Sequence, residues 1–278
     1  MNSGHTRVRH ALLPDWAAPA NVHALMTTRV TAIDGNVGAS TGVYGDAQGQ
    51  NGFNLATHVG DAPDAVAHNR QLLRQILPSE PLWLNQTHGV AIARHSHVEA
   101  CPEADAVLLT ERNQVGVIMT ADCLPVLFTT RAGTMVAGAH AGWRSLVSGI
   151  LEKTVAAMVQ AGAANDQIIV WLGAAIGAEQ FEVGAEVREA FLEAGRALGI
   201  SAEQTDACFV ARGNDGNAPQ KYLADIYALA RQRLQCAGLH ATQISGGGLC
   251  TVSDAQRFYS YRRDGTTGRM ASLIWLES

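Results

Sequence analysis

The stretch VGVIMTADCLPVLFTTRAGTMVAGAHAGWR, residues 115–144, decides the fold of this chain. It contains short apolar runs that are rich in β-branched residues, and these runs predict β-strands at 115–119, 124–129 and 134–138. The connections between the runs are far shorter than the roughly dozen residues that a crossover between parallel strands needs. The stretch therefore predicts antiparallel or mixed pairing and not a regular series of βαβ units.

Outward from this stretch, the chain predicts further strands, several helices and two loops. Apolar runs predict strands at 168–172 and 271–276. Apolar residues at helical spacing predict helices over 63–77, 145–161, 184–198 and 219–236. Gly, Asn, Asp and Ser gather at 31–52, which predicts a long flexible loop, and at 212–219, which predicts a surface connection. We therefore expect one α+β domain over residues 1–278, with mixed β-sheets layered with helices.

The composition is that of a globular protein without a surface for nucleic acid or membrane. Hydrophobic residues make up 47% of the chain, charged residues 16%, and the net charge is −5. This mild acidity argues against a nucleic-acid partner, and no apolar run approaches the roughly 20 residues of a membrane helix. The N-terminal residues lack the apolar block of a secretory signal, and the five cysteines form no CxxC pair. We expect a cytoplasmic protein without a disulfide framework.

Three residues capable of binding a metal interrupt the apolar runs where strands are expected to end. They are His88 in WLNQTHGVAI, Cys123 in TADCLP and His140 in AGAHAGWR. Strand ends that meet at one rim of a sheet commonly form a site. Two imidazoles and a thiolate suit a zinc ion whose fourth position stays open. The same residues also suit a nucleophile–base dyad in which Asp122 orients the imidazole, and the sequence leaves both interpretations open.

Basic residues elsewhere predict the recognition of an anion. Arg144 is expected in the first turn of a helix, where backbone N–H groups and a guanidinium favour phosphate or carboxylate. The segment FYSYRRDGTTGR (258–269) combines tyrosines and arginines that suit a base, a sugar or an anion, with a polar β-hairpin as the alternative interpretation. Asn54 and Arg70 lie beside apolar segments and are also candidates for substrate binding, although a helix cap or a core hydrogen bond would explain each of them equally well. The substrate-binding candidates are Arg144, Arg262, Arg263, Asn54 and Arg70.

The chain resembles a bacterial family described both as polyphenol oxidases with a laccase domain and as purine nucleoside phosphorylases. The resemblance runs from about residue 22 to the C-terminus, through NQTHG, ADAVLLT, TADCLPV, AHAGWR, GAAIGAEQFEVG, GLCT and FYSYRRDGTTGRMASLIWL. It implies a layered sandwich like that of cysteine hydrolases and a zinc ion held by His88, Cys123 and His140. It also implies phosphorolysis of adenosine, inosine, guanosine and 5′-methylthioadenosine, beside adenosine deamination.

For deamination, Asp122 is the predicted proton-transfer group, because it is the carboxyl nearest to a predicted ligand in sequence. Alternation along a strand would, however, turn it away from Cys123. The chain departs from the family pattern at Thr120, at Ser145, in GAAIG (173–177), which lacks a proline, and in a loop at 31–52 that is longer than usual. None of these positions is a predicted ligand.

The resemblance also implies two alternative functions. Related members are described as copper-dependent polyphenol oxidases, and Cu²⁺ would substitute for Zn²⁺ in such a shell. A multicopper centre is not expected, because the sole HxH motif, His95-Ser96-His97, has no matching partner. Others are described as peptidoglycan-editing factors, which supports a Cys–His thiol hydrolase acting on a peptidoglycan precursor. The expected partners are a purine nucleoside and phosphate, with the protein as a monomer or homodimer.

Overall fold

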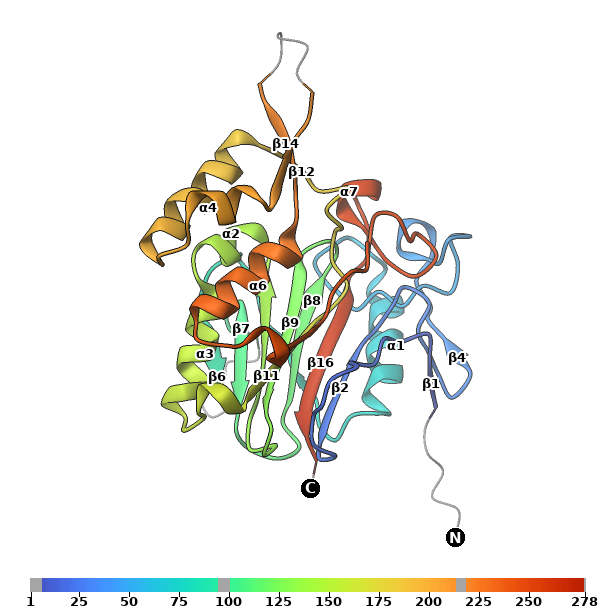
Figure 1. Ribbon diagram of the computed structural model, residues 1–278. Helices are drawn as coiled ribbons and strands as arrows, with labels where there is room; N and C mark the ends of the chain where they lie inside the picture. The colour runs from blue at the N-terminus through green and yellow to red at the C-terminus, as the bar shows by residue number, and fades with distance from the viewer. Residues whose placement is uncertain (1–6, 95–100, 214–218, 278) are drawn as a thin grey trace.

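The strands of the decisive stretch lie at the centre of two different sheets. The structure is a computed structural model, and it describes residues 7–94, 101–213 and 219–277 (Figure 1). The stretch forms β8 (Val115–Thr120), β9 (Leu124–Thr130) and β10 (Val136–Ala141). β9 and β10 pair as an antiparallel hairpin, as predicted, whereas β8 pairs in a second sheet. Residues 121–123 therefore pass from one sheet to the other.

The two large sheets pack face to face. The six-stranded sheet has the order β15 (Ile244–Gly246), β11 (Ile168–Leu172), β9, β10, β7 (Ala106–Leu109) and β6 (Ile92–Arg94). The four-stranded sheet has the order β2 (Val22–Met26), β16 (Met270–Leu276), β8 and β5 (Pro81–Leu82). Ile118 and Ile274 of the second sheet share one apolar cluster with Leu127 and Val136 of the first. Each sheet mixes parallel and antiparallel pairs, which confirms the predicted mixed sheets.

Helices cover the outer faces of both sheets. α1 (Pro63–Arg74) places Leu72 and Leu73 against the four-stranded sheet. α3 (Ile150–Gln160) and α6 (Ile226–Cys236) cover the six-stranded sheet, where Leu151 and Leu234 join the largest apolar cluster. The order of layers is helix, sheet, sheet, helix (Figure 1). Because β8, β9, β10 and β16 are covered on both faces, all of their residues are buried, and their sequences are nearly continuous apolar runs.

The smaller elements flank this sandwich. A three-stranded sheet of β12 (Glu182–Gly184), β14 (Lys221–Ala224) and β13 (Phe209–Ala211) lies beside α4 (Ala185–Ala197) and α5 (Ala202–Asp206), at the top of Figure 1. A second one joins β1 (Val8–Arg9), β3 (Ala32–Ile33) and β4 (Asn36–Val37). Two short helices, α2 (Trp143–Val147) and α7 (Tyr261–Asp264), lie beside the loops that carry the site described below.

Two predicted helices differ from the observed ones. The helix expected over 145–161 is divided into α2 and α3, because Gly149 adopts a left-handed φ of 91° that no α-helix continues through. The helix expected over 219–236 begins only at Ile226. Its predicted start, Lys221–Ala224, forms β14 instead, which pairs with β12 and β13 on its two edges. Long-range pairing has overridden local preference there.

The predicted loops also contain more structure than expected. Residues 31–52 include β3, β4 and a bridge between Ser40 and Gly52. The hairpin alternative for residues 258–269 is wrong, because Ser260 caps α7 by accepting a hydrogen bond from the backbone N–H of Arg263. The His95–His97 motif and residues 214–218 of the predicted 212–219 connection lie outside the described residues. Within the described ranges, every helix is too short or too polar to span a bilayer.

Candidate metal centre

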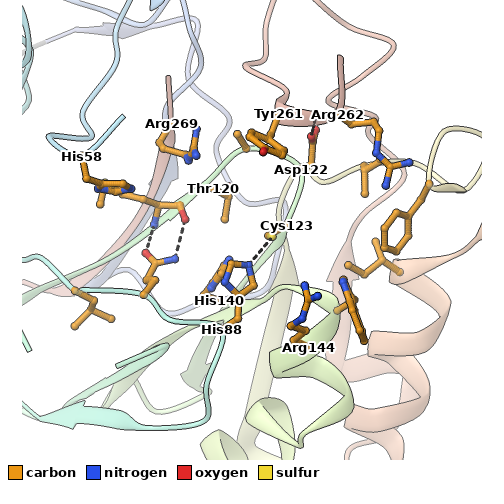
Figure 2. A pocket seen from close by; sticks show the side chains of 18 of the residues that line it. His58, His88, Thr120, Asp122, Cys123, His140, Arg144, Tyr261, Arg262 and Arg269 are labelled. Atoms are coloured by element: carbon orange, nitrogen blue, oxygen red, sulfur yellow. Dashed lines mark hydrogen bonds between the residues drawn. The ribbon is translucent and has the colours of Figure 1, made fainter. Parts of the chain in front are cut away.

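His88, Cys123 and His140, far apart in the chain, meet where strands of both sheets end. Cys123 lies in the crossing between the sheets, His140 is the penultimate residue of β10, and His88 lies in the loop between β5 and β6. One nitrogen of each imidazole and the Sγ of Cys123 all lie within 4.8 Å of one another. Sγ is 3.6 Å from Nε2 of His88, and the two rings meet edge to face with centroids 4.7 Å apart (Figure 2). The predicted convergence of the three residues is therefore observed.

A buried carboxylate, Asp105, holds the two histidines in place. Its Oδ1 lies 2.7 Å from Nδ1 of His140, which leaves Nε2 of that ring to face Cys123. The same carboxylate accepts backbone N–H groups of Thr87, His88 and Gly89 at 3.2, 3.0 and 2.6 Å. Burial alone would raise the pKa of Asp105, but hydrogen bonds from His140 and Gly89 outweigh burial and lower the pKa. Asp105 thus resembles the carboxylates that orient metal-binding histidines from behind.

The backbone around the three ligands is unusual. His88 and Asp122 adopt left-handed φ angles of 62° and 84°, which are uncommon for residues with a side chain. A Cβ on Gly142 would lie 2.7 Å from Cδ2 of His88 and 3.0 Å from Sγ of Cys123. Only glycine therefore fits between the ligands and the start of α2. Gln86 fixes the His88 loop to β8 through a pair of 2.8 Å hydrogen bonds with the backbone of Met119.

Electrostatics in the metal-free site favour a thiolate. Burial alone would raise the pKa of the Cys123 thiol, but the charge of His140 and hydrogen bonds from both imidazoles outweigh burial and lower the pKa to about 6. Burial lowers the pKa of His140, whereas Cys123 and Asp105 raise it, to about 9. At neutral pH the metal-free pair is thus a thiolate beside an imidazolium. A metal cation would replace the proton between them.

The separation between Cys123 Sγ and His88 Nε2 is compatible with both atoms binding one metal ion such as zinc. Zinc bonds of about 2.3 Å to sulfur and about 2.0 Å to nitrogen, at a tetrahedral angle, put those two atoms about 3.5 Å apart. The observed separation of 3.6 Å agrees with this value before any movement of the ligands. Across the described residues, this is the one group of three or more His, Cys, Asp or Glu side chains suited to a metal. The described part of the chain therefore offers a single metal centre.

The three ligands lie in the wall of a pocket of about 500 Å³. Its lining combines apolar side chains such as Phe181 and Trp143 with cationic ones. In Figure 2, His58 and Arg269 lie to one side of the ligands, and Arg144 and Arg262 lie to the other. A pocket of this size, partly apolar and with a few convergent polar groups, is typical of small-molecule sites.

Three of the other residues predicted from the sequence line this pocket. Arg144 lies in the first turn of α2, as predicted, and its guanidinium is 4.4 Å from the ring centroid of Trp143. Arg262 contacts the pocket, but its Nη1 donates to the backbone oxygen of Glu182 at 2.9 Å. The Asp122 carboxylate accepts the Thr251 hydroxyl at 2.5 Å and the backbone N–H of Arg262 at 2.6 Å. Asp122 therefore fastens α7 to the crossing between the sheets.

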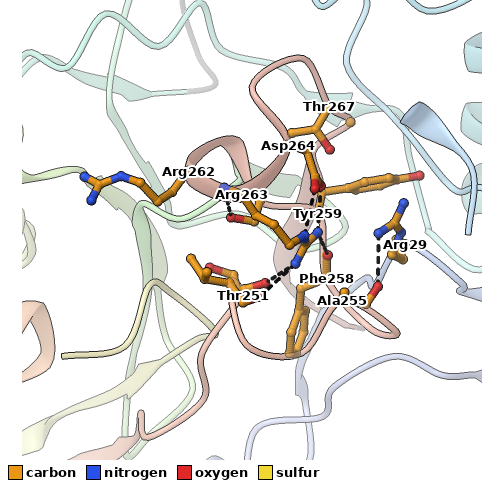
Figure 3. Close-up of polar contacts among 12 residues, drawn as sticks. Arg29, Thr251, Ala255, Phe258, Tyr259, Arg262, Arg263, Asp264 and Thr267 are labelled. Carbon is orange, nitrogen blue, oxygen red and sulfur yellow. Dashed lines mark hydrogen bonds and ion pairs between the residues drawn. The ribbon is translucent and has the colours of Figure 1, made fainter. Parts of the chain in front are cut away.

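Three other predicted residues lie outside the pocket lining. The guanidinium of Arg263 binds Asp264 and backbone oxygens, including those of Thr251 and Phe258 (Figure 3). Arg70 stacks 3.7 Å from the ring centroid of Trp83. Asn54 is fully buried and forms core hydrogen bonds, among them one at 2.9 Å to the backbone N–H of Arg269. These three side chains therefore stabilise the fold and do not line the pocket.

Two further lining residues, Tyr261 and Arg269, come from the segment 258–269 that the sequence predicts for a base, a sugar or an anion, whereas His58 and Asp105 were not predicted. Arg269 and His58 come from loops on opposite halves of the chain, and Tyr261 stands at the rim with 63% of its surface exposed. Burial, followed by the charges of Arg269 and Arg70, lowers the pKa of His58. Asp105 carried the one usable signal, since it is an acidic residue directly before a buried apolar strand. His58 carried none, because polar residues are common in loops.

Comparisons with known proteins match nearly the whole chain, although the names that the matches bear describe two different activities. Residues 24–277 match a family described as multi-copper polyphenol oxidoreductase laccase. The chain is 47% identical to a purine nucleoside phosphorylase of Pseudomonas aeruginosa, over 96% of this chain and 98% of that protein. It is 45% identical to the purine nucleoside phosphorylase YfiH of Escherichia coli, over 95% of this chain and 98% of that protein. The crystal structure of Neisseria meningitidis protein NMB0706 has a TM-score of 0.80 and 43% identity, over 97% of this chain and 100% of that one.

Proposed function

The chain belongs to the multi-copper polyphenol oxidoreductase laccase family, and from that premise we propose that it is a zinc-dependent purine nucleoside phosphorylase. Relatives at 47% and 45% identity bear the name purine nucleoside phosphorylase. The proposed substrates are adenosine, inosine, guanosine and 5′-methylthioadenosine, each with inorganic phosphate. Deamination of adenosine is a proposed second activity at the same centre.

The observation that supports the proposal is the position of the three ligands in the pocket wall. Partly buried Cys123 and exposed His88 leave the ligand set open toward the pocket, while His140 is held from behind by Asp105. When bound there, zinc would have an open coordination position and would act as a Lewis acid. A structural zinc site would instead close its fourth position with a protein ligand.

The remaining lining residues suit the substrates. In phosphorolysis, a phosphate oxygen forms a bond to C1′ of the ribose as the bond from C1′ to the purine nitrogen breaks, and the purine leaves with the electron pair. The site must therefore hold an anion and a flat, largely apolar base together. Arginines supply positive charge and hydrogen-bond donors, and the His58 imidazole supplies a further hydrogen-bonding group, while Trp143, Phe181 and Tyr261 supply surface for the base. Asp122 stays a prediction as the proton-transfer group for deamination.

The experiment that tests this function is product analysis by mass spectrometry on protein of measured metal content. Adenosine is supplied with and without inorganic phosphate. Adenine and ribose 1-phosphate, formed only with phosphate, are expected for phosphorolysis, and inosine without phosphate is expected for deamination. No product from metal-loaded protein with any of the four nucleosides would contradict the proposal.

A thiol hydrolase acting on a peptidoglycan precursor is the second candidate. It is favoured by the low pKa of Cys123 and by the two imidazoles beside the thiol, an arrangement that activates nucleophilic cysteines. The two functions respond oppositely to chelation. Phosphorolysis should be lost when the metal is removed, whereas a thiol hydrolase should gain activity as the thiolate becomes free.

A copper-dependent polyphenol oxidase is the third candidate, and the description of the family favours it. The described residues offer one three-ligand group, whereas multicopper chemistry needs several such groups. Cu²⁺ in this single shell is the form in which phenol oxidation would arise. Phenol oxidation that rises in proportion to bound copper, in protein that turns over no nucleoside, would support it.

A further inference from the structure

Arg269 differs from Arg29, a buried arginine of the described structure, in how its guanidinium is hydrogen-bonded. Arg29 donates from all three guanidinium nitrogens, to the backbone oxygens of Gly45, Asp46 and Ala255. Arg269 donates only from Nη1, to the oxygens of Thr267 and Gly268 at 2.9 and 3.1 Å. Within the described ranges, Arg269 has no carboxylate partner, and its Nε and Nη2 have no acceptor.

The position of Arg269 indicates which kind of ligand its unpaired Nε and Nη2 could bind. Its side chain is half-buried, and it lines the same pocket as the three metal ligands. Partial burial of a guanidinium without a counter-ion is unfavourable, and an anion that enters the pocket would offset this cost. The edge formed by Nε and Nη2 matches two oxygens of a phosphate or carboxylate.

A second, independent observation comes from Thr120 at the end of β8. Its side chain is 2% exposed and lines the pocket, and its Oγ1 has no hydrogen-bond partner among the described residues. Buried hydroxyls are nearly always hydrogen-bonded, so this one lacks an acceptor that a ligand would supply. Figure 2 shows Thr120 between Arg269 and Cys123.

The third donor on this side is His58, which lies in the loop that Asn54 ties to Arg269. Asn54 Oδ1 accepts the backbone N–H of Arg269, and Asn54 Nδ2 donates to Asp61 at 2.9 Å. Among the described residues, the one carboxylate that lines the pocket is Asp122, and both of its oxygens are already hydrogen-bonded. The side of the pocket formed by His58, Thr120 and Arg269, termed here the Arg269 wall, therefore offers donors and positive charge without a competing acid.

We infer that the Arg269 wall is the phosphate-binding subsite of the pocket, with inorganic phosphate held by the open edge of Arg269, the Thr120 hydroxyl and His58. This inference deepens the proposed function and rests on it for the identity of the anion. It moves phosphate away from Arg144, Arg262 and Arg263, the residues that the sequence predicted for the anion. Arg144 is exposed and stacked on Trp143, and Arg262 already donates to backbone oxygens, so neither has the enclosed, open donor edge of Arg269.

The test is calorimetric titration of inorganic phosphate into metal-loaded protein without nucleoside. Arg269→Gln should weaken phosphate binding by about 10- to 100-fold, the loss expected for hydrogen bonds to a charged group. Thr120→Val, which keeps the shape, should weaken it by about 2- to 10-fold. Arg269→Lys, which keeps the charge and loses the bidentate edge, should lie between wild type and Arg269→Gln. Arg196→Gln, on the exposed face of α4, is the matched control and should bind as wild type does.

The possible outcomes separate this inference from the proposed function. Equal phosphate binding by wild type and Arg269→Gln, or a larger loss in Arg144→Gln than in Arg269→Gln, would overturn the subsite even if ribose 1-phosphate is formed. Arg269-dependent binding of phosphate by a protein that forms no ribose 1-phosphate would support the subsite and contradict the phosphorylase. Wild-type protein that does not bind phosphate at all would overturn the subsite.

Discussion

The two sides of the pocket are built differently. On the ligand side, His140 ends a strand of the central sheet, Cys123 lies in a tight crossing between two sheets, and both histidines are tied to one buried carboxylate, Asp105. The Arg269 wall combines one strand-end residue with two loops, and Asn54 links those loops to each other. The ligand side is therefore fixed by the sheets and by Asp105, whereas the Arg269 wall depends on side-chain hydrogen bonds between loops.

Removing a ligand should have the largest effect. Cys123→Ala takes away the single sulfur and the negative charge of the site, so we expect loss of bound metal and a fall of more than about 100-fold in nucleoside turnover. Elemental analysis and steady-state kinetics check this. Cys236→Ala, an exposed cysteine on α6, is the control and should keep both. Full metal content in Cys123→Ala would contradict the ligand role.

Removing the support of the ligand side should have the next largest effect. Asp105→Asn replaces the carboxylate that orients His140, and such a change typically costs about 10- to 100-fold in metal affinity. Competition with a chromogenic chelator measures that affinity. Phosphate affinity, measured at saturating metal, should change much less. An equal loss of metal affinity and phosphate affinity would show that the metal ligands and the Arg269 wall depend on the same support, and would contradict the prediction.

Removing the hydrogen bonds that support the Arg269 wall should weaken phosphate binding and leave metal binding unchanged. Asn54→Ala deletes the acceptor for the Arg269 backbone and the donor to Asp61, so we expect KM for phosphate to rise by about tenfold, the value of one or two such hydrogen bonds. Metal affinity should stay as in wild type. A loss of metal in this variant, at a temperature where circular dichroism shows it folded, would contradict the claim that Asn54 supports the Arg269 wall and not the metal ligands.

The smallest expected effect is on thiol reactivity in metal-free protein. Because the imidazoles lower the pKa of Cys123 to about 6, its thiolate predominates above that pH and is lost as pH falls through it. Alkylation by iodoacetamide should therefore keep its rate down to about pH 6, whereas the rate at Cys236, whose pKa is raised by burial, should fall well above neutral pH. At pH 6.5 Cys123 should react only several-fold faster, because a low-pKa thiolate is also a weaker nucleophile. Added zinc should abolish the difference, and a rate at Cys123 that rises only above pH 8 would contradict the shift.

The contrast between the two sides also explains what the sequence could predict. The strands at 115–119, 124–129, 168–172 and 271–276 are confirmed because two covered faces force continuous apolar runs. The ligand side follows from the same strands, since a polar residue at the end of a buried run is conspicuous.

The Arg269 wall could be predicted only in part: the segment 258–269 indicates an anion site, but the sequence does not indicate which of its arginines keeps an open donor edge. Whether an arginine is solvated, paired as Arg263 is with Asp264, or left with an open edge depends on neighbours that are distant in the chain. Residues 221–224 differ from their predicted helix for a similar reason. They form β14 because they pair with β12 and β13, and the local pattern does not indicate these partners. Local patterns report on burial, and they do not report on which distant groups become neighbours.

The central claim is that one metal ion binds His88, Cys123 and His140 together. X-ray absorption spectroscopy at the edge of the metal that copurifies with the protein tests it most directly. A single ion per chain with one sulfur at about 2.3 Å and two imidazole nitrogens at about 2.0–2.1 Å is the predicted result. A first shell of oxygen and nitrogen without sulfur would contradict the claim.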